Sequence, residues 1–240
     1  MSKKLALLAL LLPILLMTFI ATPVQATQEI IDSDYEEGEK LKVSAVMYKN
    51  TGEIDPNWDY YAVKCTIEDI YAKNDYWKGP LYADVWLYFS PSAEEVPSNH
   101  EPKAGWSWSQ AMVTFSYQGI GFRVNLPAYG VSYEAKHEGG YFKVHWSFCG
   151  VSGIAFDFVF RDYAETAVGV RVPQGYKPYC WASGWAAWYV NYFYLVFVYD
   201  SQEWVGWCYV DPPGAANLLA PTVPSFPDVR RLIQGRRRRK

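Results

Sequence analysis

The chain has 240 residues, of which 50% are hydrophobic and 18% are aromatic, and its formal net charge is −3. Residues 27–226 carry 24 acidic and 13 basic side chains, a net charge of −11, whereas residues 227–240 carry a net charge of +6. An acidic body argues against nucleic-acid binding by the folded domain, because phosphate contacts need clustered Lys and Arg. By length, the part after the leader is one domain with a sizeable core.

The N-terminus, residues 1–26, has the organisation of a signal peptide. Two lysines precede an apolar stretch over residues 5–21, and a site of small residues ends at Ala26. We expect cleavage near Ala26 and a secreted or cell-surface location. The alternative is that the segment is retained as a membrane anchor.

The next segment, residues 27–40, contains the acidic sequence DSDYEEGE. Its carboxylates lack the spacing of a calcium loop, so we predict an acidic, flexible N-terminal segment. From residue 41 onward, short apolar alternations are separated by Gly, Pro, Asn and Asp. The strands expected before residue 179 are 41–48, 60–67, 81–89, 106–118, 122–126, 130–136, 141–148, 154–161 and 165–172. Residues 90–104 are expected to form a long surface loop.

The stretch from residue 179 to residue 210 is the most apolar outside the leader. Residues 188–199 are apolar or aromatic at both alternating sets of positions, which predicts a central strand covered on both faces. Residues 200–203 read as a turn and residues 204–210 as the returning strand, which would place Tyr199 opposite Trp204. A helical turn before Trp188 is the alternative for the first part of the stretch.

These patterns predict an all-β fold: an antiparallel β-sandwich, jelly-roll-like, with about nine to eleven strands and little helix. The sandwich is expected over residues 41–211. Residues 212–240 read as a Pro-rich linker and a basic tail, which either contacts anionic surfaces or is a solvated end.

Four cysteines, an even number, lie in the exported part: Cys65, Cys149, Cys180 and Cys208. An oxidising compartment favours two disulfides, with buried thiols as the alternative. A Cys180–Cys208 bond would need the chain to fold back near Gly184; otherwise each pairs with Cys65 or Cys149. No pair has C-x-x-C spacing, so no metal site or cofactor is expected.

One strand and the region after the long loop hold the candidate ligand-binding residues. Aromatic rings can stack on the apolar faces of sugars while nearby polar groups accept sugar hydroxyls. The candidates are Tyr82, Asp84, Trp86, Tyr88, Trp106 and Trp108. The alternative is that these aromatics cover the sheet as part of the core.

A glycoside hydrolase of this architecture would use two carboxylates across a groove. The acidic residues considered for this role are Asp84, Glu134, Glu138, Asp157 and Glu203. None lies in a hydrolase motif, and the three histidines are scattered, so the sequence favours a protein that is not an enzyme.

The sequence therefore predicts an exported, non-enzymatic β-sandwich that binds glycans or other surface components. Its expected partner is a glycan or an extracellular protein, and self-association is possible for strands that are apolar on two sides. The alternatives are a structural subunit of an extracellular assembly and a secreted glycoside hydrolase with a carboxylate pair.

Overall fold

The structure is a computed structural model that describes residues 28–73, 75–107, 111–152, 155–192 and 196–214. The predicted signal peptide and most of the predicted linker and basic tail lie outside these residues.

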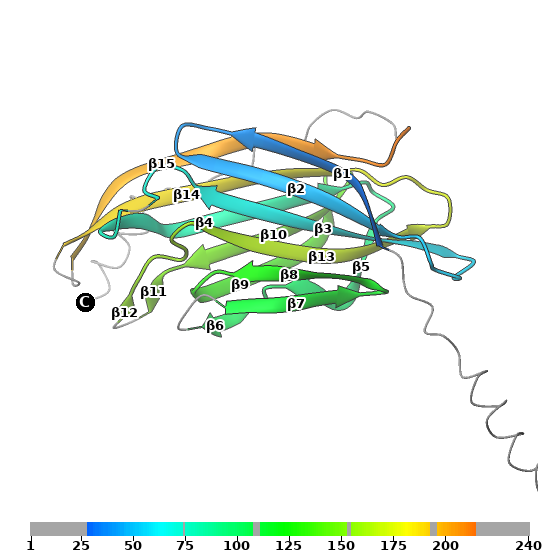
Figure 1. The fold of residues 1–240 in the computed structure, drawn as a ribbon, viewed down its shortest axis with the longest axis horizontal. Helices are drawn as coiled ribbons and strands as arrows, with labels where there is room; N and C mark the ends of the chain where they lie inside the picture. Colours follow the sequence, from blue (N-terminus) through cyan, green and yellow to red (C-terminus); the bar gives the residue numbers. More distant parts are fainter. Residues whose placement is uncertain (1–27, 74, 108–110, 153–154, 193–195, 215–240) are drawn as a thin grey trace, which may run out of the picture.

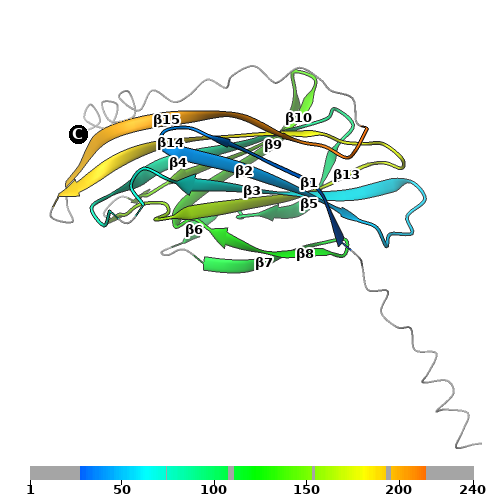
Figure 2. The ribbon, with the colours of Figure 1, turned by 45° about the horizontal axis from the view of Figure 1, so that its top comes forward.

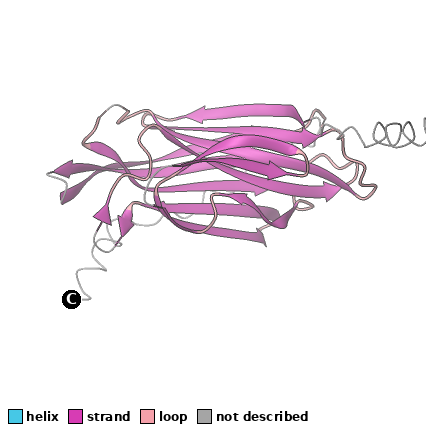
Figure 3. Ribbon diagram, turned by 60° about the horizontal axis from the view of Figure 1, so that its bottom comes forward, coloured by secondary structure: helices cyan, strands magenta, loops and turns pink. Residues whose placement is uncertain are grey.

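The described part of the chain is built from strands alone (Figure 3). In chain order these are β1 (Gln28–Glu37), β2 (Leu41–Asn50), β3 (Trp58–Asp69), β4 (Lys78–Phe89), β5 (Glu94–Glu101), β6 (Gly105–Ser107), β7 (Ala111–Tyr117), β8 (Ile120–Leu126), β9 (Tyr129–Glu138), β10 (Tyr141–Cys149), β11 (Val151–Ser152), β12 (Ala155–Phe156), β13 (Tyr163–Pro173), β14 (Cys180–Tyr192) and β15 (Val196–Val210). None of the described ranges contains a helix long and apolar enough to cross a membrane.

Two antiparallel sheets pack face to face (Figures 1 and 2). Sheet A has the strand order β1-β2-β3-β13-β5, and sheet B has the order β15-β14-β4-β10-β9-β6. Two hairpins, β7–β8 and β11–β12, form separate two-stranded sheets. The predicted antiparallel β-sandwich is therefore confirmed.

The core between the sheets is supplied by alternate residues of each strand. In β2, the odd-numbered side chains from Leu41 to Met47 are fully buried and their neighbours are partly exposed. Alternate residues over 83–89 of β4 and over 142–148 of β10 enter the same core from sheet B. A strand places successive side chains on opposite faces, so this periodicity fixes which face is buried.

The β7–β8 hairpin covers the outer face of sheet A. Phe115, Tyr117 and Ile120 of the hairpin are buried in a cluster with Ala167 of β13. Gly169 of β13 allows this approach, because a Cβ added there would lie 2.4 Å from the Tyr117 ring. No real Cβ contact is that short, so any larger residue would push the hairpin away.

Strand β1 corrects the prediction of a flexible N-terminal segment. Residues 28–37 pair with β2 along their whole length, from Gln28 opposite Asn50 to Glu37 opposite Lys42. The acidic residues of this segment favour a solvated chain when the sequence is considered alone. The sequence does not show that their carboxylates accept hydrogen bonds from backbone N–H groups at the end of β15. Figures 1 and 2 show β1 beside β15, at an edge where the two sheets meet.

Carboxylates join these two edge strands. Asp34 Oδ2 accepts a hydrogen bond from the backbone N–H of Tyr209 at 2.8 Å, and Asp32 Oδ2 accepts one from Asp211 at 3.0 Å. Glu203 of β15 accepts three more from backbone N–H groups of residues 39–41. Unpaired strand edges invite association with other chains, and these bonds satisfy backbone donors at the end of β15 and in the β1–β2 turn.

The β14–β15 hairpin differs from the prediction in its register. The chain reverses between Tyr192 and Val196, inside the apolar run, and Tyr199 lies opposite Tyr189 rather than Trp204. The predicted turn at 200–203 is instead part of β15. Exposed and half-buried side chains alternate along this part of the edge strand, where Asp200 pairs with Lys78 at 3.0 Å.

Three other segments need smaller corrections. The predicted loop 90–104 contains the edge strand β5, which pairs with β13. The expected strand 106–118 is divided between β6 and β7, and the expected strand 154–161 is reduced to the two described residues of β12. The helical alternative before Trp188 is replaced by β14.

Candidate functional site

The predicted ligand-binding residues of β4 lie on the outer face of sheet B. Tyr82, Trp86 and Tyr88 point away from the main core and pack with residues of β10, β14 and β15. The members of this second cluster, called here the outer aromatic cluster, are Leu81, Tyr82, Trp86, Tyr88, Tyr141, Cys149, Phe158, Trp181, Trp185, Ala187, Tyr189, Phe197, Tyr199, Trp204 and Trp207. Trp106 is in β6 at the far edge of sheet B, but its side chain and the whole of Trp108 lie outside the described residues.

The rings of β4 are covered by other rings of the protein. Trp86 is 3% exposed and Tyr88 is 8% exposed. The His145 ring stacks on Trp86, with centroids 5.0 Å apart and planes 7° from parallel. Tyr141 and Trp207 meet Tyr88 edge-on at 5.7 and 5.2 Å. Stacking on a sugar needs an open ring face. Glycan binding at Trp86 or Tyr88 therefore stays a prediction, and it requires His145, Tyr141 or Trp207 to move away from these rings.

Asp84, the carboxylate predicted beside these aromatics, is paired with a histidine. Its Oδ1 lies 2.7 Å from Nε2 of His145, and the two side chains are 5% and 25% exposed. His145 stands opposite Trp86 in β4 and opposite Glu134 in β9, so it separates the aromatic part of sheet B from a charged part. A buried carboxylate needs a compensating partner, and His145 supplies it.

The other carboxylates considered for hydrolysis also have structural partners. Glu134 and Glu138 lie 3.0 and 3.4 Å from Nζ of Lys136, and Asp157 lies 3.4 Å from Arg161. Glu203 accepts the three backbone hydrogen bonds at the β1–β2 turn. Each of these carboxylates is therefore paired within the protein.

No disulfide joins any two of the four cysteines, all of which lie in the described residues. Cys65, Cys180 and Cys208 face the core between the sheets, whereas Cys149 lies on the outer face of sheet B. The prediction of two disulfides is therefore wrong. Cys149 cannot reach the other three cysteines, because it lies on the opposite face of sheet B. Burial raises the pKa of the Cys208 thiol to about 12 and holds those of Cys65 and Cys180 well above their usual range.

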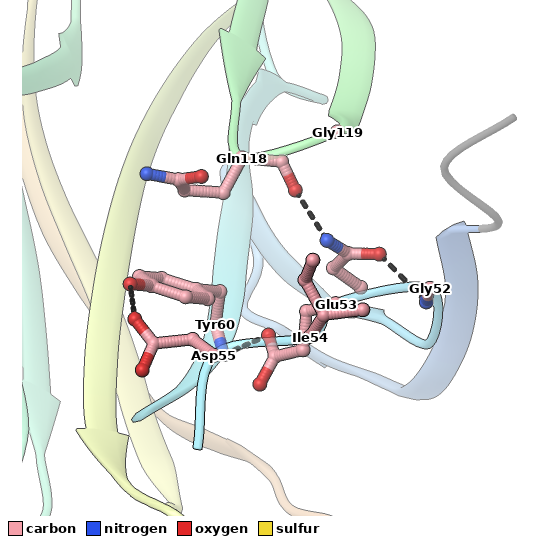
Figure 4. A pocket seen from close by; sticks show the side chains of 8 residues that line it. Gly52, Glu53, Ile54, Asp55, Tyr60, Gln118 and Gly119 are labelled. Atoms are coloured by element: carbon pink, nitrogen blue, oxygen red, sulfur yellow. Dashed lines mark hydrogen bonds between the residues drawn. The ribbon is translucent and has the colours of Figure 1, made fainter. Parts of the chain in front are cut away.

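A polar cleft lies at the end of the sandwich where the β2–β3 and β7–β8 turns meet (Figure 4). It has a volume of about 460 Å³ and is lined by Asn50, Gly52, Glu53, Ile54, Asp55, Tyr60, Gln118 and Gly119. A hydrogen bond of 2.7 Å from Asn50 Nδ2 to the carbonyl oxygen of Gln118 joins the two turns, and Tyr60 donates its hydroxyl to Asp55 at 2.8 Å. No sequence pattern indicates this cleft.

The cleft is acidic. Burial and the neighbouring Asp59 carboxyl raise the pKa of Glu53 to about 7, although Glu53 accepts a backbone hydrogen bond from Tyr60. Asp59 is held by Lys49 at 3.3 Å. Within the described ranges, no three His, Cys, Asp or Glu side chains gather so as to hold a metal ion. The cleft is therefore a polar surface that contains one carboxyl group, that of Glu53, with a raised pKa.

The β3–β4 loop and the start of β13 lie at the opposite end of the sandwich with the β14–β15 hairpin, on the left in Figure 1. Among the described residues, seven of the twelve large hydrophobic residues that are exposed belong to these segments. We call this group the aromatic end; it consists of Tyr71, Tyr76, Trp77, Tyr163, Tyr192, Val196 and Val198. Their exposed fractions range from 38% at Tyr163 to 59% at Tyr76.

Backbone contacts bring the segments of the aromatic end together. The N–H of Asn191 donates to the carbonyl oxygen of Trp77 at 2.6 Å, which ties the β14–β15 hairpin to the β3–β4 loop. Arg161 donates from Nη1 to the carbonyl oxygen of Tyr76 at 2.7 Å, and its guanidinium lies 4.9 Å from the Tyr76 ring centroid. The aromatic end is therefore fixed to the sandwich body.

Two sequence signals correspond to the aromatic end. The pair Tyr76-Trp77 stands in a loop, between turn residues, where an aromatic side chain has little core to enter. The run 188–199 is apolar on both faces because it includes the end of a hairpin, not because a single strand is buried on both sides. Tyr192, Val196 and Val198 are each about half exposed as a result.

Comparison with known proteins gives neither a family nor a curated relative: no family model matches the chain, and no curated protein matches it. Several solved structures are similar in arrangement. A pore-forming protein has 10% identity over 78% of this chain and 90% of its own, with a TM-score of 0.47. The membrane-inserted form of the Clostridium perfringens NetB toxin has 7% identity, 78% and 94% coverage, and a TM-score of 0.38. The Clostridium perfringens delta-toxin has 8% identity, 75% and 86% coverage, and a TM-score of 0.33. At these TM-scores the likeness carries no argument about function.

Proposed function

We propose that this protein is an exported, non-enzymatic β-sandwich that attaches to components of a cell surface through its aromatic end. The observation that carries the proposal is the gathering of exposed Tyr, Trp and Val side chains from three separate chain segments at one end of the body. An apolar patch kept exposed on a folded domain is typical of an interaction site. The signal-peptide pattern of residues 1–26 supports an exported location.

The contacts of the predicted catalytic carboxylates support binding rather than hydrolysis. Asp84 is paired with His145, and Glu134 and Glu138 with Lys136. A hydrolase needs one carboxyl to give up a proton and another to attack or to activate water, which such pairing opposes. The outer aromatic cluster likewise fills space that a substrate would need.

A binding panel tests this function. The purified protein is applied to immobilised polysaccharides, phospholipid vesicles and intact cells, in parallel with Trp77→Ser and Ile54→Ser variants. Ile54 is 96% exposed at the opposite end, so it is a matched control for the loss of an exposed apolar side chain. We expect binding to at least one surface that the Trp77 variant weakens and the Ile54 variant keeps. Equal binding by both variants, or no binding to any surface, would refute the proposal.

A further inference from the structure

The shape of the aromatic end indicates whether it binds a small ligand or a flat surface. The described hollow at this end, between the β3–β4 loop and residues 161–162, has a volume of about 180 Å³. Sites for small ligands are concave and generally hold 300–1,000 Å³. The exposed side chains instead project from a hairpin and a loop, and projecting apolar side chains need a soft or flat partner.

The residue types of the aromatic end favour a lipid interface over the surface of another protein. Tyr and Trp combine an apolar ring with a polar group, and they concentrate where hydrocarbon meets water in a membrane. Val196, which lies opposite Tyr192, and Val198 add purely apolar side chains. A protein partner would require matched polar contacts, whereas a lipid interface accepts this mixture without a fixed pattern.

The aromatic end has no excess of positive charge, because Asp75 and Asp162 also line its hollow beside Arg161. Lys73 pairs with Glu68 at 2.9 Å, Lys78 with Asp200 at 3.0 Å and Arg161 with Asp157 at 3.4 Å. Cations also lie over the rings: Nζ of Lys78 is 3.9 Å from the centroid of Tyr71, and Nζ of Lys40 is 4.5 Å from it. Cations already matched by carboxylates have little excess attraction for anionic lipid, so this surface suits headgroups that carry both charges.

We propose that the aromatic end inserts into the interfacial layer of a zwitterionic phospholipid bilayer, with Trp77, Val196 and Val198 among the lipids. This inference rests on the proposed function, because it names the surface to which the aromatic end attaches. Insertion removes the half-exposed apolar side chains from water, and ring hydroxyls and the indole N–H remain at headgroup level.

The test measures binding of the purified protein to phosphatidylcholine vesicles by co-sedimentation. The double variant Val196→Ser, Val198→Ser is expected to bind about tenfold more weakly, because two apolar side chains no longer leave water. Ile54→Ser is expected to bind like the original protein. Raising NaCl from 0.05 to 0.5 M is expected to change binding by less than about twofold, since paired charges contribute little attraction. Trp77→Phe reports insertion separately: it should remove part of the fluorescence quenching that lipids brominated near the interface produce.

The outcomes distinguish this inference from the proposed function. Binding to cells or polysaccharide that depends on Trp77, without binding to phosphatidylcholine vesicles, overturns the lipid target and leaves the function standing. Binding only to vesicles with anionic lipid, lost at high salt, overturns the zwitterionic target in the same way. If no surface shows binding that depends on the aromatic end, both the lipid target and the proposed function are overturned. Near-ultraviolet circular dichroism checks that the variants are folded. We expect them to fold, because the substituted side chains of the hairpin are about half exposed.

Discussion

Glu203 offers a direct test of how the two sheets are joined. One carboxylate oxygen accepts the N–H of Glu39 at 2.9 Å, and the other accepts those of Lys40 and Leu41 at 2.7 and 2.8 Å. Glu203→Ala would leave these three donors without their acceptor. Water can reach the exposed N–H of Glu39, but the other two bonds are partly buried, so we count only those two.

A part-buried donor that loses its partner costs about 1–2 kcal/mol, the lower part of the range for buried groups, so the loss of two should lower the free energy of unfolding of Glu203→Ala by about 2–4 kcal/mol. In a domain of this size that corresponds to a fall in Tm of roughly 10 °C. Thermal unfolding gives the Tm, and hydrogen exchange gives the protection of amides 39–41, which should fall more than that of the core strands.

Glu134→Ala is the matched control. Glu134 also belongs to sheet B and contacts Lys136, but its side chain is 53% exposed. An exposed ion pair is worth about 0–1 kcal/mol, so this variant should unfold close to the original protein. A Glu203→Ala variant within about 0.5 kcal/mol of the original would refute the reasoning, since lost bonds of this kind should cost more. Equal destabilisation by both variants would refute it too.

Three further predictions concern single groups. Trp188→Phe removes the hydrogen bond from the indole N–H to Asp69, which is 3.1 Å long and buried, and should cost about 1–3 kcal/mol in urea unfolding; an unchanged midpoint would contradict it. Gly169→Ala should cost more than about 2 kcal/mol, because its Cβ would lie 2.4 Å from the Tyr117 ring; a stable variant with the β7–β8 hairpin in place would count against the close approach. For Glu53, the pKa in the folded protein is raised from 4.5 to about 7, so its contribution to stability is present at low pH and is lost as pH rises through 7. The Tm of the original protein relative to that of Glu53→Gln should therefore fall between pH 5 and pH 8, and a constant difference would disprove the raised pKa.

Much of the strand pattern is local and could be predicted. In β4, apolar alternation identifies one face for the core, and the structure places Ala83, Val85 and Leu87 there. In the β9–β10 hairpin, Gly139 and Gly140 both have positive φ, as a tight turn between two strands requires, and the sequence HEGG marks the turn directly. Such features depend on neighbouring residues in the chain, so the sequence carries them.

The candidate sites depend on contacts between distant segments and were predicted less well. The outer face of β4 is aromatic, as the sequence indicates, but only the structure shows that His145, Tyr141 and Trp207 cover its rings. The reversal inside residues 188–199 was missed because an exposed apolar hairpin end and a strand buried on both faces have the same composition. The polar cleft at Asn50 and Gln118 joins turns 68 residues apart, which no local pattern reports.

The antiparallel all-β character of the chain and the faces of its strands follow from the sequence alone, because alternation and turn residues act over a few positions. Tertiary structure alone decided that the acidic N-terminal residues form an edge strand, that three cysteines face the core while Cys149 faces outward, and which aromatic side chains are exposed. The physical reason is that burial and pairing are properties of the partners a side chain meets across the sheets. Those partners are set by register and by sheet order, which the single chain encodes only through its whole fold.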